Sequence, residues 1–194
     1  METLSVVLSC IIPFVHFSAF LIYYRAVARG QSTLYTAMWA LTIVCSILNG
    51  VTYLAMTRNL VMSATPVTNA VAVCGVLIIG WRYRKYRPFQ PLDWVVLVIG
   101  LAVIGLWIAS GNADDANLLL QAALMLAIIP AYAGVWQGER ENPWPWTLWS
   151  VSHVINLSIL FMLWNGNYKA LVSPVLYIIA NTGMVILIIM RKRS

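Results

Sequence analysis

The segment LDWVVLVIGLAVIGLWIA, residues 92–109, decides the class of fold, because it is almost entirely apolar and contains a single charged residue, Asp93. A transmembrane helix needs about 20 consecutive, predominantly apolar residues. Comparable runs recur along the chain, at 4–24, 34–56, 60–81, 92–109, 115–136, 145–164 and 170–190. We therefore predict an all-α integral membrane protein with seven transmembrane helices. A β-barrel is not favoured, because its strands would be about ten residues long and would alternate in polarity.

The composition of the whole chain agrees with this prediction. Of the 194 residues, 61% are hydrophobic and only 9% are charged, whereas a soluble domain is about 25% charged. This balance excludes a soluble enzyme, a disordered tail and a nucleic-acid-binding protein, because so much apolar surface could not be hidden from water. The predicted helices leave only short loops, so any function must lie inside the bundle or at those loops.

The positive charges are distributed unevenly between the two sides of the predicted bundle. Most of them follow the first, third, fifth and seventh runs: Arg25, Arg29, Arg82, Arg84, Lys85, Arg87, Arg140, Arg191, Lys192 and Arg193. Only Arg58 and Lys169 fall on the other side. Because cytoplasmic loops are enriched in lysine and arginine, we predict an outside N-terminus and a cytoplasmic C-terminus, in a multi-pass protein of the cell (inner) membrane. Topology thus explains the net charge of +6, and the predicted partner is the lipid bilayer, not nucleic acid.

An internal repeat organises the predicted helices. Three pairs of residues recur at a nearly constant offset: Pro66 with Pro174, Gly75 with Gly183, and Trp39 with Trp149. The first two pairs are 108 positions apart and the third is 110 positions apart. We predict a first three-helix repeat over 1–91, a linker helix over 92–114 and a second three-helix repeat over 115–194. A single linking helix gives both repeats the same orientation, which is a known transporter design with its substrate site near the midplane.

The first and fifth runs correspond less closely. Each carries a proline after two isoleucines, Pro13 and Pro130, at an offset of 117. This match is seven residues out of step with the others, or two helical turns, so it would keep the helix face but not the depth in the membrane. Both prolines are candidate hinges, and fixed kinks are the alternative.

This layout resembles the SWEET and PQ-loop superfamily of small seven-helix membrane proteins, with related vitamin carriers of the PnuC type, and also a branch of uncharacterised bacterial proteins. The resemblance covers nearly the whole chain at the level of topology. Proteins of that superfamily carry gating prolines in helices 1, 2, 5 and 6, and substrate-facing asparagines in helices 3 and 7. The resemblance therefore implies gating roles for Pro13 and Pro130 and substrate contacts for Asn69 and Asn181. The chain departs from the pattern, because it has no proline within helices 2 and 6 and lacks the Pro-Gln dipeptide.

Polar residues inside the predicted membrane segments define a candidate substrate site. Such side chains are costly in lipid and usually face the interior of a bundle. The candidates lie on the second, third, sixth and seventh helices: Trp39, Ser46, Asn49, Asn69, Trp149, His153, Asn156, Tyr177 and Asn181. Amides and hydroxyls can exchange hydrogen bonds with a neutral polyol or heterocycle, and indoles can stack on a sugar or a planar ring. The lack of a carboxylate or ammonium deep in the membrane favours an uncoupled facilitator of a neutral, sugar-like or vitamin-like solute, and a proton carried by His16 or His153 is the alternative.

Structural roles are the alternative for each of these residues. Serine, threonine and asparagine often serve as hydrogen-bond partners between membrane helices. Trp39 and Trp149 begin their helices, so both could anchor at the membrane interface, and the Pro-Trp-Pro-Trp stretch at 143–146 is predicted to be such an aromatic belt. Asp93 stands in the first turn of its helix, where the helix dipole is sufficient to explain it.

Three classes of function remain open. The leading hypothesis is a facilitator in which two helix triplets give alternating access to a midplane site. The alternatives are a seven-helix receptor and a structural membrane protein without transport activity. A microbial-type opsin is disfavoured, because the lysines nearest the seventh helix, Lys169 and Lys192, lie at its ends.

The sequence offers no sign of catalysis. It contains no catalytic motif and no metal-ligand spacing. The three cysteines, Cys10, Cys45 and Cys74, lie within predicted helices and are interpreted as small packing residues. We therefore predict no enzyme activity, no cofactor and no metal, and a homo-oligomer is compatible with the sequence.

Overall fold

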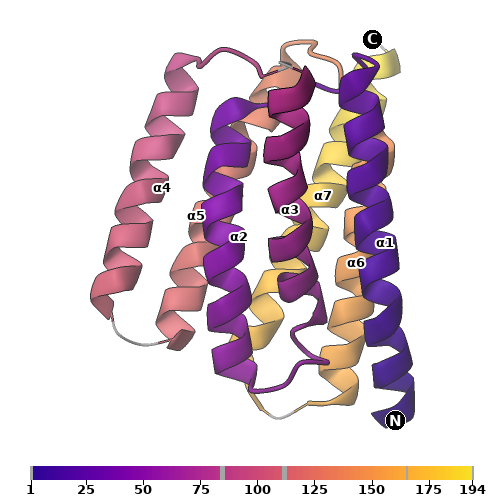
Figure 1. Ribbon diagram of the computed structural model, residues 1–194, viewed down its shortest axis with the longest axis vertical. Helices are drawn as coiled ribbons and strands as arrows, with labels where there is room; N and C mark the ends of the chain where they lie inside the picture. Colours follow the sequence, from indigo (N-terminus) through magenta and orange to yellow (C-terminus); the bar gives the residue numbers. More distant parts are fainter. Residues whose placement is uncertain (1, 84–85, 111–112, 165, 194) are drawn as a thin grey trace.

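The chain folds as a bundle of helices (Figure 1). This computed structural model describes residues 2–83, 86–110, 113–164 and 166–193. These residues form seven α-helices: α1 (Glu2–Ala28), α2 (Thr36–Thr57), α3 (Ala64–Tyr83), α4 (Pro91–Ser110), α5 (Ala113–Trp136), α6 (Pro143–Met162) and α7 (Lys169–Arg193). The prediction of an all-α chain is confirmed, and every helix overlaps one of the predicted apolar runs. Arg84, Lys85 and the side chain of Arg193, counted above among the basic residues, lie outside the described part.

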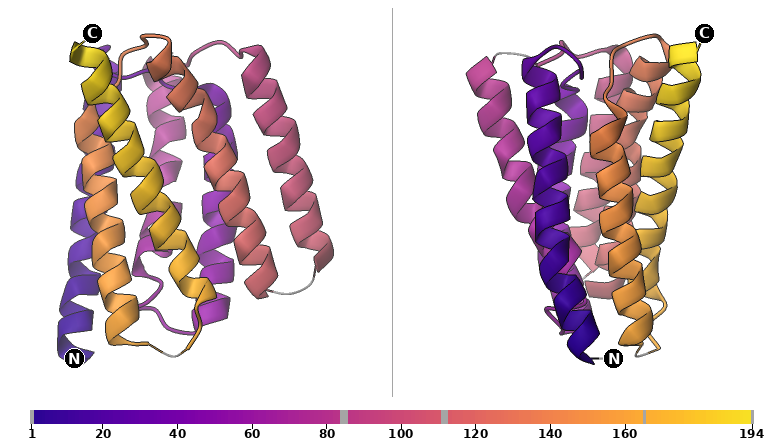
Figure 2. Two further views of the ribbon diagram at one scale, coloured as in Figure 1. Left: turned by 180° about the vertical axis from the view of Figure 1, so that it is seen from behind. Right: turned by 90° about the vertical axis from the view of Figure 1, so that its right-hand side faces the viewer.

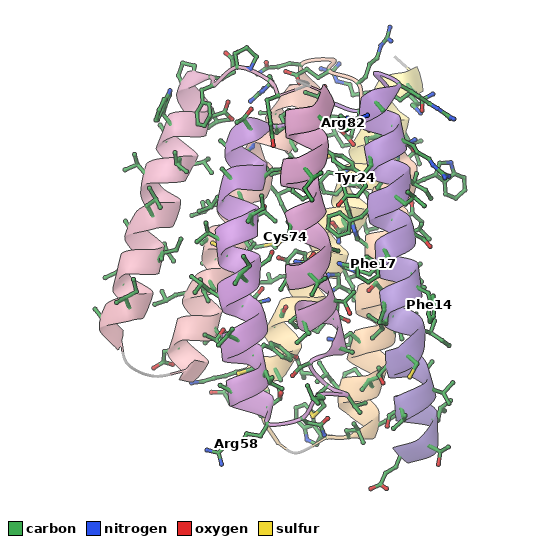
Figure 3. The ribbon with its side chains drawn as sticks, viewed as in Figure 1. Phe14, Phe17, Tyr24, Arg58, Cys74 and Arg82 are labelled. Carbon is green, nitrogen blue, oxygen red and sulfur yellow. The ribbon has the colours of Figure 1, made fainter. Side chains whose placement is uncertain are left out.

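The surface of the bundle is apolar. Four helical segments are long and apolar enough to cross a membrane: Glu2–Ala28, Thr36–Thr57, Asn117–Trp136 and Lys169–Lys192. Shorter apolar segments lie in α3 and α4, at Ala64–Val76 and Pro91–Leu106. Large apolar side chains such as Phe14 and Ile179 are 76% and 64% exposed, and Phe14 points away from the bundle in Figure 3. A surface of this kind suits lipid and not water. These features indicate a membrane protein, whereas seven spans and their orientation stay predictions.

The helices form two triplets with a linker helix at one edge. In the first triplet α3 contacts both α1 and α2, and in the second α7 contacts both α5 and α6. The triplets meet chiefly through two pairs of helices, α1 with α6 and α2 with α5. The linker α4 packs on α5 and α2 at the edge of the bundle (Figures 1 and 2). The interior between the triplets is thus built by six helices and excludes α4.

The two ends of the bundle differ in charge. The end that carries the C-terminus and the loops 29–35, 86–90 and 137–142 is called the basic end here, because most arginine and lysine residues lie near it. The end that carries the N-terminus is called the opposite end (Figure 1). Arg82 lies toward the basic end and Arg58 at the opposite end in Figure 3. This distribution is the one from which the orientation was predicted.

Each triplet contains the same partly buried helix contact. Tyr24 in α1 donates a hydrogen bond to the carbonyl oxygen of Ala72 in α3 at 2.9 Å, and Tyr132 in α5 donates to the carbonyl oxygen of Ala180 in α7. Each hydroxyl lies over a glycine of the partner helix, because a Cβ atom at Gly75 or Gly183 would meet it at 2.5 or 2.6 Å. These equivalent residues are all 108 positions apart. The repeat in the sequence therefore coincides with a repeated helix contact.

The turns after α1 and α5 are also equivalent, and they fix the register of these two helices. Gly30 and Gly138 have φ values of +69° and +93°, a conformation that glycine adopts without strain. Each glycine N–H donates to the residue three positions before it, Val27 or Val135, at 3.0 and 3.1 Å. The glycines are 108 positions apart, whereas Pro13 and Pro130 are 117 apart. The two prolines therefore do not occupy equivalent positions, and the match between them is coincidental.

Candidate functional site

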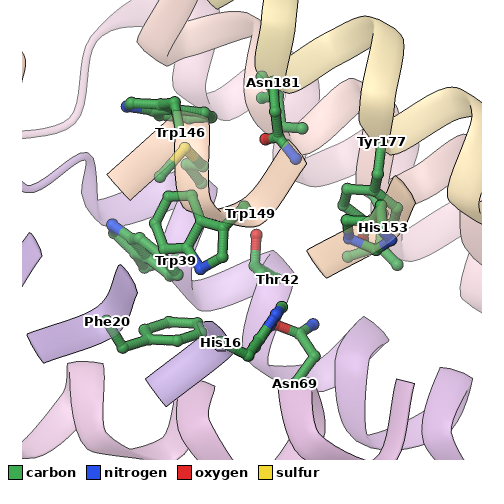
Figure 4. A pocket seen from close by; sticks show the side chains of 13 residues that line it. His16, Phe20, Trp39, Thr42, Asn69, Trp146, Trp149, His153, Tyr177 and Asn181 are labelled. Carbon is green, nitrogen blue, oxygen red and sulfur yellow. The ribbon is translucent and has the colours of Figure 1, made fainter. Parts of the chain in front are cut away.

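A cavity lies between the two triplets (Figure 4). Six of the nine predicted site residues line it: Trp39, Asn69, Trp149, His153, Tyr177 and Asn181. The other lining residues are His16, Phe20, Met38, Thr42, Leu124, Ile128 and Trp146. None of these lining residues carries a carboxylate, an ammonium or a guanidinium group. The cavity is thus an uncharged pocket shared by every helix of the two triplets.

An aromatic cluster forms the wall of the cavity nearest the basic end. The Trp39 and Trp149 rings lie 6.3 Å apart between centroids, and Phe20 lies 5.1 Å from Trp149 at 65°. Trp39 Nε1 donates to the hydroxyl of Tyr23 at 2.9 Å, which fixes the indole. Edge-to-face aromatic contacts of this kind stabilise a rigid wall. The cluster offers ring faces and edges to whatever enters the cavity.

Three of the four tryptophans for which an interfacial role was considered are buried. Trp39, Trp149 and Trp146 are 4%, 6% and 3% exposed, and only Trp144 is largely exposed. Trp146 packs edge-to-face on Trp149, with centroids 5.4 Å apart. The aromatic-belt prediction for 143–146 is therefore wrong for Trp146. The reason is the geometry of α6: two positions along a helix correspond to a rotation of about 200°, so Trp146 points inward where Trp144 points outward.

A chain of hydrogen bonds crosses the cavity and joins four helices. His16 in α1 lies 3.0 Å from Ser152 Oγ through Nδ1 and 3.0 Å from Asn69 Oδ1 through Nε2. Asn69 in turn donates to Ser46 Oγ at 2.9 Å. Because an amide oxygen only accepts, His16 Nε2 carries the proton, and in the neutral imidazole Nδ1 accepts from the Ser152 hydroxyl. Ser46 and Asn69 are therefore held by the protein itself, and His16 is a central site residue that was not among the predicted ones.

Four other polar atoms of the cavity have no hydrogen-bond partner among the described residues. They are Trp149 Nε1, His153 Nδ1, Tyr177 Oη and Asn181 Nδ2. The His153 and Tyr177 rings stack at 4.5 Å with an interplanar angle of 1°, which holds both side chains in place. Buried polar groups are normally paired, and an unpaired one is costly. These four groups are therefore the ones with hydrogen-bonding capacity left for a ligand.

The remaining predicted residues serve other contacts or lie away from the cavity. Asn49 accepts hydrogen bonds from Asn117 at 2.7 Å and from Gln121 at 2.6 Å, so it links α2 to α5. Asn156 is buried beside Tyr53, toward the opposite end. Pro13 lies in a lateral groove of α1 with Phe14, whereas Pro130 is buried within α5. Asn69 and Asn181 thus converge on one cavity, and Asn156 does not join them.

Both ends of the cavity are closed in this conformation. Toward the opposite end, Tyr53, Met62, Leu160 and Ala170 form a second buried apolar cluster, in which Tyr53 donates to the Ala170 carbonyl at 2.8 Å. The cavity volume is about 50 Å³, which holds only a few water molecules. Ligand pockets usually measure about 300–1,000 Å³. The cavity in this structure is thus smaller than a typical ligand pocket.

Loop contacts between the triplets close the basic end. Thr33 N–H donates to the Arg140 carbonyl at 3.1 Å, and Asn142 N–H donates to Ser32 Oγ at 3.1 Å. The loop that contains Ser32 and Thr33 follows α1, and the loop that contains Arg140 and Asn142 follows α5. These bonds therefore join corresponding loops of the two triplets across the basic end.

An ion network extends this closure to α4. Arg87 donates to both carboxylate oxygens of Asp93 at 2.8 Å and to Glu139 Oε1 at 3.1 Å. Its guanidinium group also lies 4.8 Å from the centre of the Tyr35 ring. The Asp93 side chain is 1% exposed. The helix dipole alone does not explain Asp93, because the residue is buried and paired with Arg87.

The lining residues that were not among the nine candidates include Trp146, which was assigned to the aromatic belt, and the other six fall into two groups. His16 and Thr42 interrupt apolar runs, so polarity was a usable signal for them. Phe20, Met38, Leu124 and Ile128 are apolar residues in apolar helices and carry no such signal.

Comparison of the chain with protein-family models, with curated proteins and with solved structures finds no match in any of the three.

Proposed function

We propose that this protein is a facilitator that moves a small, neutral, polar solute across the cell (inner) membrane. The observation that supports this proposal is the uncharged cavity between the triplets, with four buried polar atoms that lack partners among the described residues. Trp149 Nε1 and Asn181 Nδ2 can only donate hydrogen bonds. A fitting solute therefore presents acceptor oxygens or nitrogens to them and an apolar or planar face to the aromatic cluster. Sugar-like and vitamin-like molecules meet both conditions.

The proposed mechanism is alternating access of the two triplets around the cavity. Both ends are closed by contacts that run between the triplets, so rigid-body rocking would open one end while the other stays closed. The basic end faces the cytoplasm in this proposal, because arginine and lysine residues gather there. No charged group of the described lining would bind a coupling ion, which favours uncoupled movement down a solute gradient.

Solute uptake into proteoliposomes tests the proposal. The purified protein is reconstituted without an ion gradient and assayed against a panel of sugars, vitamins and nucleosides. We expect flux of at least one neutral solute, and a loss of about fivefold in apparent affinity in Asn181→Ala, since a buried hydrogen bond is worth roughly 1 kcal/mol. Thr182→Val is the matched control, because Thr182 is exposed next to Asn181 and bonds only weakly, at 3.3 Å, to Ser150.

The outcomes separate the facilitator from its alternatives. A folded sample that moves none of the solutes would favour a receptor or a structural membrane protein. Equal losses in Asn181→Ala and Thr182→Val would remove the cavity from the mechanism even if flux occurs.

A further inference from the structure

Glu141 is a buried carboxyl group at the junction of the two triplets, outside the membrane-spanning helices. It belongs to the loop between α5 and α6 and is only 5% exposed. Its Oε1 atom accepts a hydrogen bond from Trp146 Nε1 at 3.1 Å, and its Oε2 atom is buried with no partner among the described residues. Trp146 lines the cavity. One side chain therefore separates this carboxyl from the proposed solute site.

The contacts of Glu141 come from both triplets. Ser32 and Thr33, in the loop after α1, face the carboxyl from the first triplet, and the Asn142 N–H faces it from the second. The same residues form the loop-to-loop bonds that close the basic end, including Asn142 N–H to Ser32 Oγ at 3.1 Å. A change of charge on Glu141 would therefore act directly on the closed gate.

No cation compensates Glu141 among the described residues. Arg87, which forms the ion pairs at this end, is occupied by Asp93 and Glu139. The titratable and charged groups that surround Glu141 are Tyr23 from α1, Tyr35 before α2, Glu139 and Arg140 from its own loop, and Arg191 and Lys192 from α7, which line the adjoining surface cleft. Glu139 is a like charge, and the hydroxyls of Tyr23 and Tyr35 are neutral at physiological pH. An ionised Glu141 would thus be a buried charge without a counterion.

We propose that Glu141 is a pH-sensitive latch of the basic-end gate, which holds the two triplets together while it carries its proton and releases them when it loses it. This inference deepens the proposed facilitator function and rests on it. A neutral carboxyl fits a site with one hydrogen-bond donor from Trp146 and a second oxygen out of contact with water. An ionised carboxylate needs water or a cation, and separation of the loops would supply water.

The direction of the pH effect follows from proton linkage. Burial raises the pKa of the Glu141 carboxyl to about 8, although the hydrogen bond from Trp146 and the polar groups of Ser32, Asn142 and Thr33 that face the carboxyl oppose the shift. In an open, hydrated gate the pKa would return to the ordinary value of about 4.3. The closed gate therefore binds the proton more tightly. Closure is fully favoured below about pH 4, weakens as the pH rises, and has lost this contribution above about pH 8.

Spin-label distances across the basic end test the latch without any solute. Arg29→Cys and Gln137→Cys place nitroxides on exposed, equivalent positions of the two triplets, in a background with Cys10→Ser, Cys45→Ala and Cys74→Ser. Double electron–electron resonance is recorded on the reconstituted protein from pH 5.5 to 9.5. We expect the ratio of long to short distances to rise by up to about tenfold per pH unit, and to level off above about pH 8.

Two variants identify the group responsible. Glu141→Gln keeps the acceptor for Trp146 but cannot ionise, so its distances should stay short at every pH. Asp115→Asn loses an exposed carboxylate at the opposite end and should keep the pH response of the native chain. A native chain whose distances do not change with pH overturns the latch, as does a Glu141→Gln chain that responds like the native one. If the distances respond to pH as expected but the protein moves no solute, the facilitator proposal is overturned and the latch proposal stands.

Discussion

Arg87 shows how much of the basic end depends on one side chain. Its guanidinium group joins the α3–α4 loop to Asp93 at the start of α4 and to Glu139 in the α5–α6 loop. The side chains of Arg87 and Asp93 are 13% and 1% exposed. Loss of one partner of such a pair leaves an uncompensated buried charge, which costs far more than the pair itself contributes. The pair therefore holds the start of α4 in one position at the edge of the bundle.

We expect Arg87→Met to lower the free energy of unfolding by about 3–5 kcal/mol, because Asp93 would stay buried without its cation. The measurement is equilibrium unfolding by sodium dodecyl sulfate in mixed micelles. Asp115→Asn is the control, since it breaks an exposed pair with Lys169 whose side chains are 24% and 57% exposed, and such pairs contribute less than about 1 kcal/mol. Equal, small losses in both variants would show that the Arg87 network does not stabilise the fold.

At the scale of elements, the triplets use the same device to bring two helices together. A tyrosine on α1 or α5 reaches over a glycine on α3 or α7 and bonds to a carbonyl oxygen one turn away. The glycine is needed because any side chain there would occupy the position of the hydroxyl. The turns that follow α1 and α5 repeat as well, at Gly30 and Gly138. The tyrosine–glycine contact and the glycine turn together explain why equivalent residues of the two triplets are 108 positions apart in the sequence.

A double-mutant cycle tests this device. Gly75→Ala places a methyl group on the hydroxyl of Tyr24, so the hydrogen bond to Ala72 is lost and we expect a destabilisation of about 1 kcal/mol. In a Tyr24→Phe background the hydroxyl is gone and the nearest ring carbon, Cζ, lies 3.3 Å from the added methyl group, so the cost of the same alanine should fall. The control is Gly105→Ala in α4, where a Cβ meets nothing within 4 Å, so the intrinsic helix preference for alanine should stabilise the protein by up to about 1 kcal/mol. Additive effects of Tyr24→Phe and Gly75→Ala would contradict the contact.

For the whole molecule, the sequence predicts the helices better than it predicts their contacts. Apolar runs located all seven helices, because a membrane helix needs a continuous apolar segment whatever its neighbours are. Listing Asn49 among the candidate site residues did not predict its role, since its side chain accepts hydrogen bonds from Asn117 and Gln121 of α5. Glu141 lies in a short polar loop, and its burial arises only when the two triplets meet. Which residues of the two triplets meet depends on how the helices pack, and an apolar run in the sequence does not predict that packing.

The orientation of the whole bundle is the last prediction. With the native cysteines replaced, Arg58→Cys and Gln137→Cys place single thiols at the opposite end and at the basic end, both on exposed positions. A membrane-impermeant maleimide applied to intact spheroplasts of a bacterial host should label Arg58→Cys at once and Gln137→Cys only after permeabilisation. The reason is the excess of arginine and lysine near the basic end, which retains that end in the cytoplasm during insertion. The reverse labelling pattern would place Glu141 and its gate on the outer side, where the external pH, and not the cytoplasmic pH, would set the latch.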